Sequence, residues 1–155
     1  MKPSRPSIEL GTWEQLHAAA LGIRWRVFVD EQGVPADMEL DEMDPLCLHA
    51  VARDASGVPV ATARLLPVVD GIGTIGRMAV DAHERGRGTG RAVLDAMVAA
   101  AVARGDRLVE LHAQVAARGF YERAGFAAEG DEYLEAGIVH VTMRRRLIPP
   151  APPGN

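Results

Sequence analysis

The fold is decided by residues 76–91, which read GRMAVDAHERGRGTGR and continue into the mostly apolar AVLDAMV at 92–98. Met78–Val80 is apolar and strand-like. Three glycines then break the pattern, because glycine adopts backbone angles that other residues resist: Gly86, Gly88 and Gly90. Beyond them, apolar residues spaced near 3.6 predict a helix from about Thr89 to Ala103, which Gly105 ends as a left-handed cap. The stretch therefore predicts a strand, a short loop and a helix in succession.

A helix that starts in such a loop points free backbone N–H groups, and the positive end of its dipole, at any nearby ligand. Flanking arginines add positive charge: Arg85, Arg87 and Arg91. We interpret the loop as a pyrophosphate site; a surface turn with solvated arginines is the alternative. A P-loop would need a Gly-Lys-Ser/Thr ending, and a dinucleotide fingerprint would need glycine where Arg91 stands.

Two motifs point to a known family. Arg85-x-x-Gly88-x-Gly90 matches an acyl-CoA signature, and residues 114–126, QVAARGFYERAGF, follow at the expected distance. The second motif keeps Ala117, Tyr121, Gly125 and Phe126, with Gln114 where Asn is commoner. Together they resemble the GNAT superfamily of N-acetyltransferases over roughly Leu46–Leu147. Residues 24–32 and 133–141 are similar to the ElaA-like subgroup, and the first of these also resembles acyl-homoserine lactone synthases.

Length and composition fit one soluble domain. The 155 residues are 48% hydrophobic and 25% charged, and we expect a single domain over 1–148 with a proline-rich tail at 149–155. A net charge of −4 gives no basic surface for nucleic acid. The single Cys47 lies in an apolar run and is interpreted as a core residue. No apolar run suits a signal peptide or a membrane span, so we expect a cytoplasmic protein.

The remaining pattern predicts α/β (α+β) architecture: a mixed, mostly antiparallel sheet of about six or seven strands flanked by helices. Thr12 with Gln15 has capping-box spacing and precedes a helix from about Trp13 to Phe28. A further short helix is expected at Ala116–Arg123. Strands are expected at Ile8–Leu10, Leu46–Arg53, Val58–Leu66, the run ending at Val80, Leu108–Val115, Phe126–Ala128 and Gly137–Leu147.

An acidic segment, residues 30–44, holds seven carboxylates, and its glycine and prolines predict a loop. A solvated loop is the plainer interpretation. Alternatively, the segment attracts a cationic amine substrate. Arg24 and Arg26 on the preceding helix could instead hold a substrate carboxylate. The sequence does not choose between these alternatives.

The resemblance implies direct attack of an amine on acetyl-CoA bound between the strand ending at Val80 and the strand Leu108–Val115. Tyr121 is the expected general acid. The base is open: Glu110 is the first candidate, with His112, His49, His140 or a water chain as alternatives. The implied coenzyme A contacts are Met78, Ala79, Val80, Arg85, Gly86, Arg87, Gly88, Thr89, Gly90, Arg91 and Gln114.

The expected acceptor is a small-molecule or peptide amine that the sequence leaves unidentified, and we assign no metal ligands, nucleic acid or membrane partner. Dimer formation is common in the family, so a homodimer is possible. Two alternatives stay open: a non-catalytic acyl-CoA-binding or regulatory module, and an acyltransferase similar to the lactone synthases.

Overall fold

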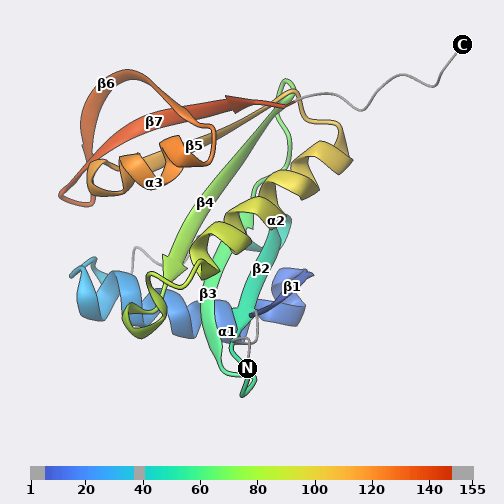
Figure 1. Cartoon of the computed structure of the whole chain (residues 1–155), viewed down its shortest axis with the longest axis vertical. Coiled ribbons are helices and arrows are strands. Elements are labelled where there is room, and N and C mark those ends of the chain that lie inside the picture. The colour runs from blue at the N-terminus through green and yellow to red at the C-terminus, as the bar shows by residue number, and fades with distance from the viewer. Residues whose placement is uncertain (1–5, 37–40, 148–155) are drawn as a thin grey trace, which may run out of the picture.

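The computed structural model describes residues 6–36 and 41–147. They form a seven-stranded sheet in the order β1-β2-β3-β4-β5-β7-β6 (Figure 1). Its strands are β1 (Ser7–Gly11), β2 (Leu48–Arg53), β3 (Pro59–Leu65), β4 (Ile72–Val80), β5 (Leu108–Gln114), β6 (Ala127–Glu135) and β7 (Ile138–Arg146). Neighbouring strands are antiparallel except β4 and β5, which run parallel. The predicted mixed sheet is confirmed.

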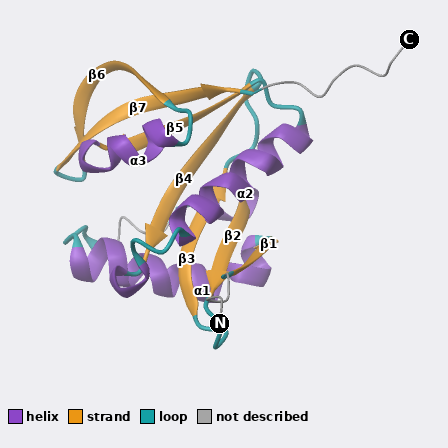
Figure 2. Ribbon diagram, viewed as in Figure 1, coloured by secondary structure: helices purple, strands orange, loops and turns teal. Residues whose placement is uncertain are grey.

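Helices cover both faces of the sheet. The long helix α2 (Thr89–Arg104) packs apolar residues such as Val93 against Ala50, Ala52 and Ala61. Helix α1 (Trp13–Arg24) packs against the opposite face, where Leu16 and Ile23 form a second core with Val51 and Ala79. Successive residues of a strand point to opposite faces, so Ala50 belongs to the core under α2 and the adjacent Val51 belongs to the core under α1. The short α3 (Arg118–Arg123) lies beside β5 and β6 (Figure 2).

The parallel strands β4 and β5 meet at one end and then separate, as Figures 1 and 2 show. They pair only from Ile72–Leu108 to Ile75–Leu111, although β4 runs on to Val80 and β5 to Gln114. Just past the paired part, Arg77 has φ +51° and the β3–β4 register shifts, which marks a β-bulge. The opening between the strands is the main consequence of this topology for function.

Three element boundaries differ from the sequence prediction. The capping box of Thr12 and Gln15 is present, but α1 ends at Arg24 and a π-helix, Trp25–Glu31, continues it. Helix α3 begins only at Arg118, after a 3₁₀ turn. Strand β6 is much longer than expected. Most of its residues are exposed, so its sequence has no apolar alternation from which the full length could be predicted.

Cys47 is buried, and its Sγ donates to the carbonyl oxygen of Met43 at 3.1 Å. Burial raises the pKa of this thiol, so it remains protonated, and the interpretation as a core residue is confirmed. In the parts of the chain that the structure describes, no helix has the length and apolarity needed to cross a membrane. The proline-rich tail at 149–155 lies outside the described residues.

Candidate active site

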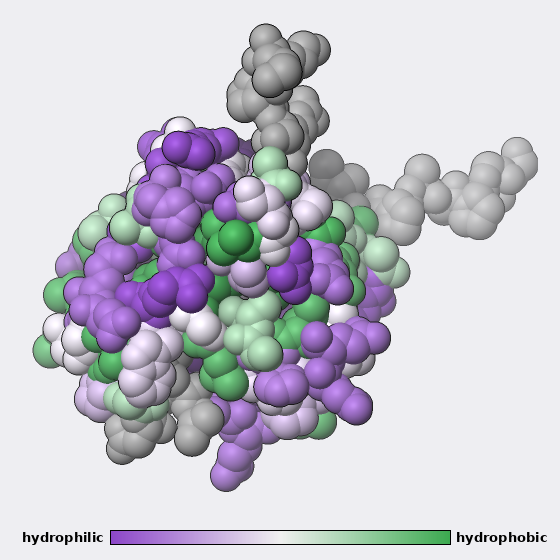
Figure 3. Space-filling view, turned by 90° about the horizontal axis from the view of Figure 1, so that it is seen from below, coloured by the Kyte–Doolittle hydropathy of each residue, from purple (hydrophilic) through white to green (hydrophobic). Residues whose placement is uncertain are grey.

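A cavity of about 830 Å³ occupies the opening between β4 and β5. Its walls are the diverging ends of these strands, the loop before α2, α3, the π-helix and the turn between β6 and β7. Beyond Ile75 and Leu111, the facing edges of β4 and β5 do not pair with each other, so their backbone groups can bond a ligand laid between them. One end of this cavity is the glycine-rich loop, and Figure 3 shows apolar surface enclosed by hydrophilic side chains on the face seen from below.

The loop before α2 has the geometry of an anion site. Gly88, the N-cap of α2, has φ +83°, and no side chain among the described residues caps this helix. The first backbone N–H groups of α2 therefore lack helical acceptors. A Cβ added at Gly86 or Gly88 would meet no atom within 4 Å, so the space above the loop is open. Thr89 turns its hydroxyl inward instead and donates to Glu84 Oε1 at 3.0 Å.

The arginines of this loop are less free than the sequence suggested. Arg85 forms a two-pronged ion pair with Glu31 of the π-helix, at 2.6 and 2.8 Å, and donates to the carbonyl of Val80. Arg91 pairs with Asp95 at 2.9 Å, whereas Arg87 is largely exposed and lies 3.9 Å from Glu84. The backbone N–H groups, rather than free guanidinium groups, would thus be the main donors to an anion bound at this loop.

Tyr121 lies on α3, lines the cavity and is only 8% exposed. Phe120 and Phe126 contact its ring edge to face, with centroids 5.0 and 6.1 Å away. Burial raises the pKa of Tyr121 to about 12. The phenol therefore keeps its proton at any physiological pH and is available as a donor to a group that becomes negative beside it.

Two histidines line the cavity opposite the loop: His112 on β5 and His140 on β7. The Nδ1 of His140 is 2.7 Å from the carbonyl oxygen of Ile138, an acceptor, so this nitrogen carries the proton and Nε2 has the lone pair. Glu135 Oε2 lies 3.5 Å from that Nε2. Tyr133 connects the two histidines: its ring stacks on that of His140, and its hydroxyl forms a hydrogen bond with Nδ1 of His112.

The other two candidate bases lie elsewhere. Glu110 is absent from the cavity wall; it pairs with Arg144 at 2.7 Å, and its second oxygen lies 3.7 Å from Nε2 of His112. His49 is fully buried, stacks against Trp13 and bonds the carbonyl of Asp44 at 2.8 Å. Burial lowers the pKa of His49 and keeps it neutral, so it is a core residue.

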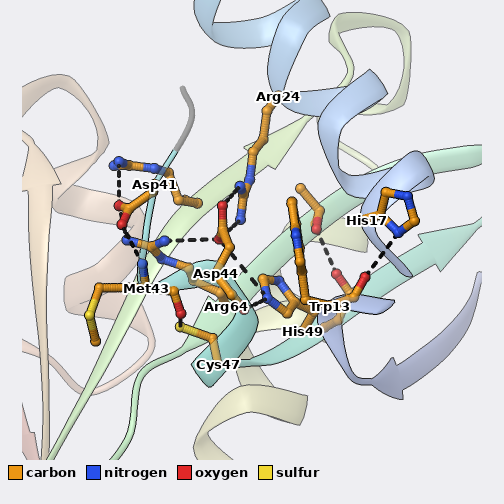
Figure 4. A network of polar contacts seen from close by, with 12 residues as sticks. Trp13, His17, Arg24, Asp41, Met43, Asp44, Cys47, His49 and Arg64 are labelled. Atoms are coloured by element: carbon orange, nitrogen blue, oxygen red, sulfur yellow. Dashed lines mark hydrogen bonds and ion pairs between the residues drawn. The ribbon is translucent and has the colours of Figure 1, made fainter. Parts of the chain in front are cut away.

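Asp37 and Glu39 of the acidic segment lie outside the described residues, and the part that is described is not simply a solvated loop. Asp44 is 1% exposed and accepts hydrogen bonds from Arg24 and Arg64, while Asp41 accepts from Arg64 and Arg77 (Figure 4). Arg24 is therefore not available to a substrate carboxylate. Arg26 bonds Asp81 at 2.8 and 3.0 Å and is not part of the cavity wall. The other alternative was that the segment attracts a cationic amine. Asp41 and Asp44 cannot contribute to that attraction, because arginines already neutralise them.

Several cavity residues were given no role at the site from the sequence. Glu31 ends the π-helix and Gln32 caps it, and Gln32 accepts a hydrogen bond from Gln114 at the end of β5. Arg77 lies in the cavity wall on β4, and Glu135 lies in it at the end of β6. Apart from Glu135, whose partner His140 is close in sequence, these residues have partners far away in the sequence, so only the folded chain brings them together.

Comparison with known proteins agrees with this geometry. The sequence model of the acetyltransferase (GNAT) domain matches residues 24–147. A Bacillus subtilis protein named as an acetyltransferase is 37% identical over 138 residues, covering 87% of this chain and 92% of its own. Escherichia coli ElaA superposes with a TM-score of 0.82 at 26% identity, over 92% of this chain and 100% of its own. A Pseudomonas aeruginosa acyl-CoA N-acyltransferase gives 0.79 at 30% identity, over 91% and 99%.

The fold and the cleft define an acyltransferase of the GNAT type. The chain belongs to the GNAT acetyltransferase family, and its structural neighbours include ElaA.

Proposed function

We propose that this protein transfers an acetyl group from acetyl-CoA to a primary amine by direct attack. The observation that carries the proposal is the cavity itself, which begins at an uncapped helix N-terminus and continues between two unpaired strand edges. The helix N-terminus suits an anionic group at one end of a long, narrow ligand, and the unpaired strand edges suit an arm that is rich in amide groups. Bound acetyl-CoA would supply an activated acetyl group as a thioester.

The chain's own residues would hold this donor in place. The N–H groups of Gly88, Thr89, Gly90 and Arg91 are the proposed donors to the pyrophosphate, with Arg85, Gly86 and Arg87 completing the loop. The unpaired edge of β4 at Met78, Ala79 and Val80 would bond the pantetheine arm, and Gln114 closes the cavity across from it. One of these β4 N–H groups could also polarise the thioester carbonyl, a contribution of about 3 kcal/mol.

Proton transfers would fall to residues on the cavity wall. Tyr121 would be the general acid that protonates the departing thiolate, and its raised pKa means that the phenol still holds its proton when the thiolate forms. We infer that His140 accepts the proton of the acceptor's ammonium group, because its Nε2 has the lone pair and Glu135 would stabilise the imidazolium. Glu110 enters this proposal only as the carboxylate behind His112.

Binding of coenzyme A can be measured without knowing the acceptor. Titration calorimetry should detect coenzyme A binding to the folded wild-type protein. Arg87→Glu should weaken it about tenfold or more, because the reversed charge would repel the bound phosphates. The side chain is exposed, so salt screens this repulsion. Arg53→Glu, which reverses an arginine on β2 outside the cavity, is the matched control and should bind normally. Absence of binding by the wild type would refute the proposal.

The assignment of the base has its own test. His140→Gln should lower kcat by about 10²- to 10⁴-fold, the usual cost of losing a general base, while leaving the Kd of coenzyme A unchanged. The measurement is thiol release from acetyl-CoA over a panel of amines, polyamines, aminoglycosides and peptide N-termini. A much larger loss in His112→Gln than in His140→Gln would assign the base to His112 instead. Tight coenzyme A binding without thiol release for any amine would favour a non-catalytic acyl-CoA sensor.

A further inference from the structure

Arg77 holds an unusual position in the cavity. It is the bulged residue of β4, with φ +51°, and costs backbone strain that a glycine would avoid. It lines the cavity where β4 and β5 begin to separate, three residues before Val80. At about 3.3 Å per residue this places its backbone about 10 Å from Val80, after which the chain turns into the loop that we assign to the pyrophosphate. Its charge is therefore displaced from the phosphate end of the cavity.

The ion cluster behind Arg77 has a surplus of positive charge among the described residues. Three guanidinium groups, of Arg24, Arg64 and Arg77, share the two carboxylates of Asp41 and Asp44. Asp41 is shared, since one oxygen accepts from both Arg64 and Arg77 and the other accepts from the N–H of Met43. Figure 4 shows Arg24 and Arg64 directed at these carboxylates.

The surplus charge is accessible only at Arg77. The side chains of Arg24 and Arg64 are 0% and 7% exposed, whereas that of Arg77 is 31% exposed and faces the cavity. The Nε atoms of all three arginines are buried without a hydrogen-bond partner in the described part of the chain, so a ligand can reach only the exposed part of the Arg77 side chain. A guanidinium that spends one arm on a shared carboxylate retains donors for a second anion. Of the other arginines in the cavity wall, Arg85 and Arg91 are each paired with one carboxylate of their own, and Arg123 lies next to Arg91 at the loop end, where its carbonyl accepts a hydrogen bond from Arg91.

We propose that Arg77 binds a carboxylate on the acceptor, so that the acceptor is an amine that also carries a carboxylate group. This inference rests on the proposed acetyl transfer. The acceptor's amine would lie towards His112 and His140 on β5 and β7, and its carboxylate towards Arg77 on β4. Such an acceptor bridges the two strands that form the cavity. An amine with no second charged group, or with a second positive charge, would leave the surplus positive charge of the cluster uncompensated.

The test uses pairs of acceptors that differ only in the carboxylate: phenylalanine and phenethylamine, lysine and cadaverine, tryptophan and tryptamine. Thiol release from acetyl-CoA should give the wild type at least a tenfold higher kcat/KM for the carboxylate-bearing member of one or more pairs. Arg77→Gln should abolish that preference by raising KM for the acid, while kcat/KM for its decarboxylated partner stays the same. Arg77→Lys, which keeps the charge, should restore part of the preference.

Two controls separate recognition from stability. Arg53→Gln removes an arginine of similar exposure, 33%, that also pairs with a carboxylate but lies outside the cavity, and it should keep the preference. Calorimetry should give Arg77→Gln the wild-type Kd for coenzyme A, which shows that the variant is folded. Equal rates within every pair, or an equal loss for both members in Arg77→Gln, would overturn the inference.

Failure of the inference is distinguishable from failure of acetyl transfer. Acetylation of some polyamine or aminoglycoside, but of no carboxylate-bearing amine, would overturn the role of Arg77 and leave the proposed function intact. Absence of thiol release with every amine would overturn both.

Discussion

Replacing Tyr121 with phenylalanine should lower kcat by about 10²- to 10⁴-fold, the range typical of a lost acid–base group. The change removes one hydroxyl from a side chain that is buried between Phe120 and Phe126, so the ring packing is retained. Without that hydroxyl, the departing thiolate must leave unprotonated or wait for water. Burial raises the pKa of Tyr121 to about 12, so the phenol of the wild type is not ionised near neutral pH. A loss of kcat measured there therefore reports the missing hydroxyl and not a change in its ionisation.

The measurement is steady-state thiol release by wild type and Tyr121→Phe with the best acceptor from the amine panel. Two controls define a chemical effect: an unchanged Kd for coenzyme A by calorimetry, and an unchanged Tm. An unaltered kcat would exclude Tyr121 as the acid. A raised KM with normal kcat would assign Tyr121 to binding alone, since only interactions specific to the transition state lower kcat.

Replacing Asp44 with asparagine should lower the free energy of unfolding by about 3–5 kcal/mol, the usual cost of removing one partner from a buried ion pair. Asp44 is 1% exposed and holds Arg24 and Arg64 with hydrogen bonds of 2.9–3.0 Å. Asparagine keeps the volume but leaves the fully buried Arg24 without a counterion. Urea unfolding at pH 7 measures the loss. Glu9→Gln, which removes the exposed partner of Arg53, should cost less than about 1 kcal/mol.

The effect of Asp44→Asn should depend on pH in a defined direction. Burial by itself would raise the pKa of Asp44, but the hydrogen bonds and charges of Arg24 and Arg64 outweigh it and hold the pKa below its ordinary value. The stabilisation is therefore complete above the unfolded pKa of about 3.9 and is lost as the pH falls through the lower folded value. The difference between wild type and variant should narrow in acid. A difference that stays constant from pH 7 to pH 3 would contradict the ionic origin of the effect.

Local rules explain what the sequence predicted correctly. The glycine-rich loop, the start and end of α2 and the capping box at Thr12 depend on neighbouring residues, and the structure has them where they were expected. The alternation along β5 predicted one buried face, and Val109, Leu111 and Ala113 are buried. Tyr121 was found through its motif and does line the cavity.

The sequence did not show the partners of its charges, because these partners are remote. Arg85, which was expected to contact phosphate, pairs with Glu31, 54 residues away, and Arg24, for which a substrate carboxylate was one alternative, pairs with Asp44, 20 residues away. An arginine in a sequence shows its charge and not its counterion. Glu110 was the first candidate base for the same reason, because its pairing with Arg144 appears only when β5 and β7 lie side by side.

The sequence by itself determined the secondary structure around the glycine loop and the family, because both depend on residue types at short, fixed spacing. Only the tertiary structure decided which charges are neutralised and which face the cavity. Pairing β4 with β5 for four residues and then separating them creates the cavity. The same arrangement buries Asp44 beneath α1 and leaves Arg77 as the accessible cation of its cluster among the described residues. Electrostatic partners are set by distance in space, and that distance is fixed only when the sheet has formed.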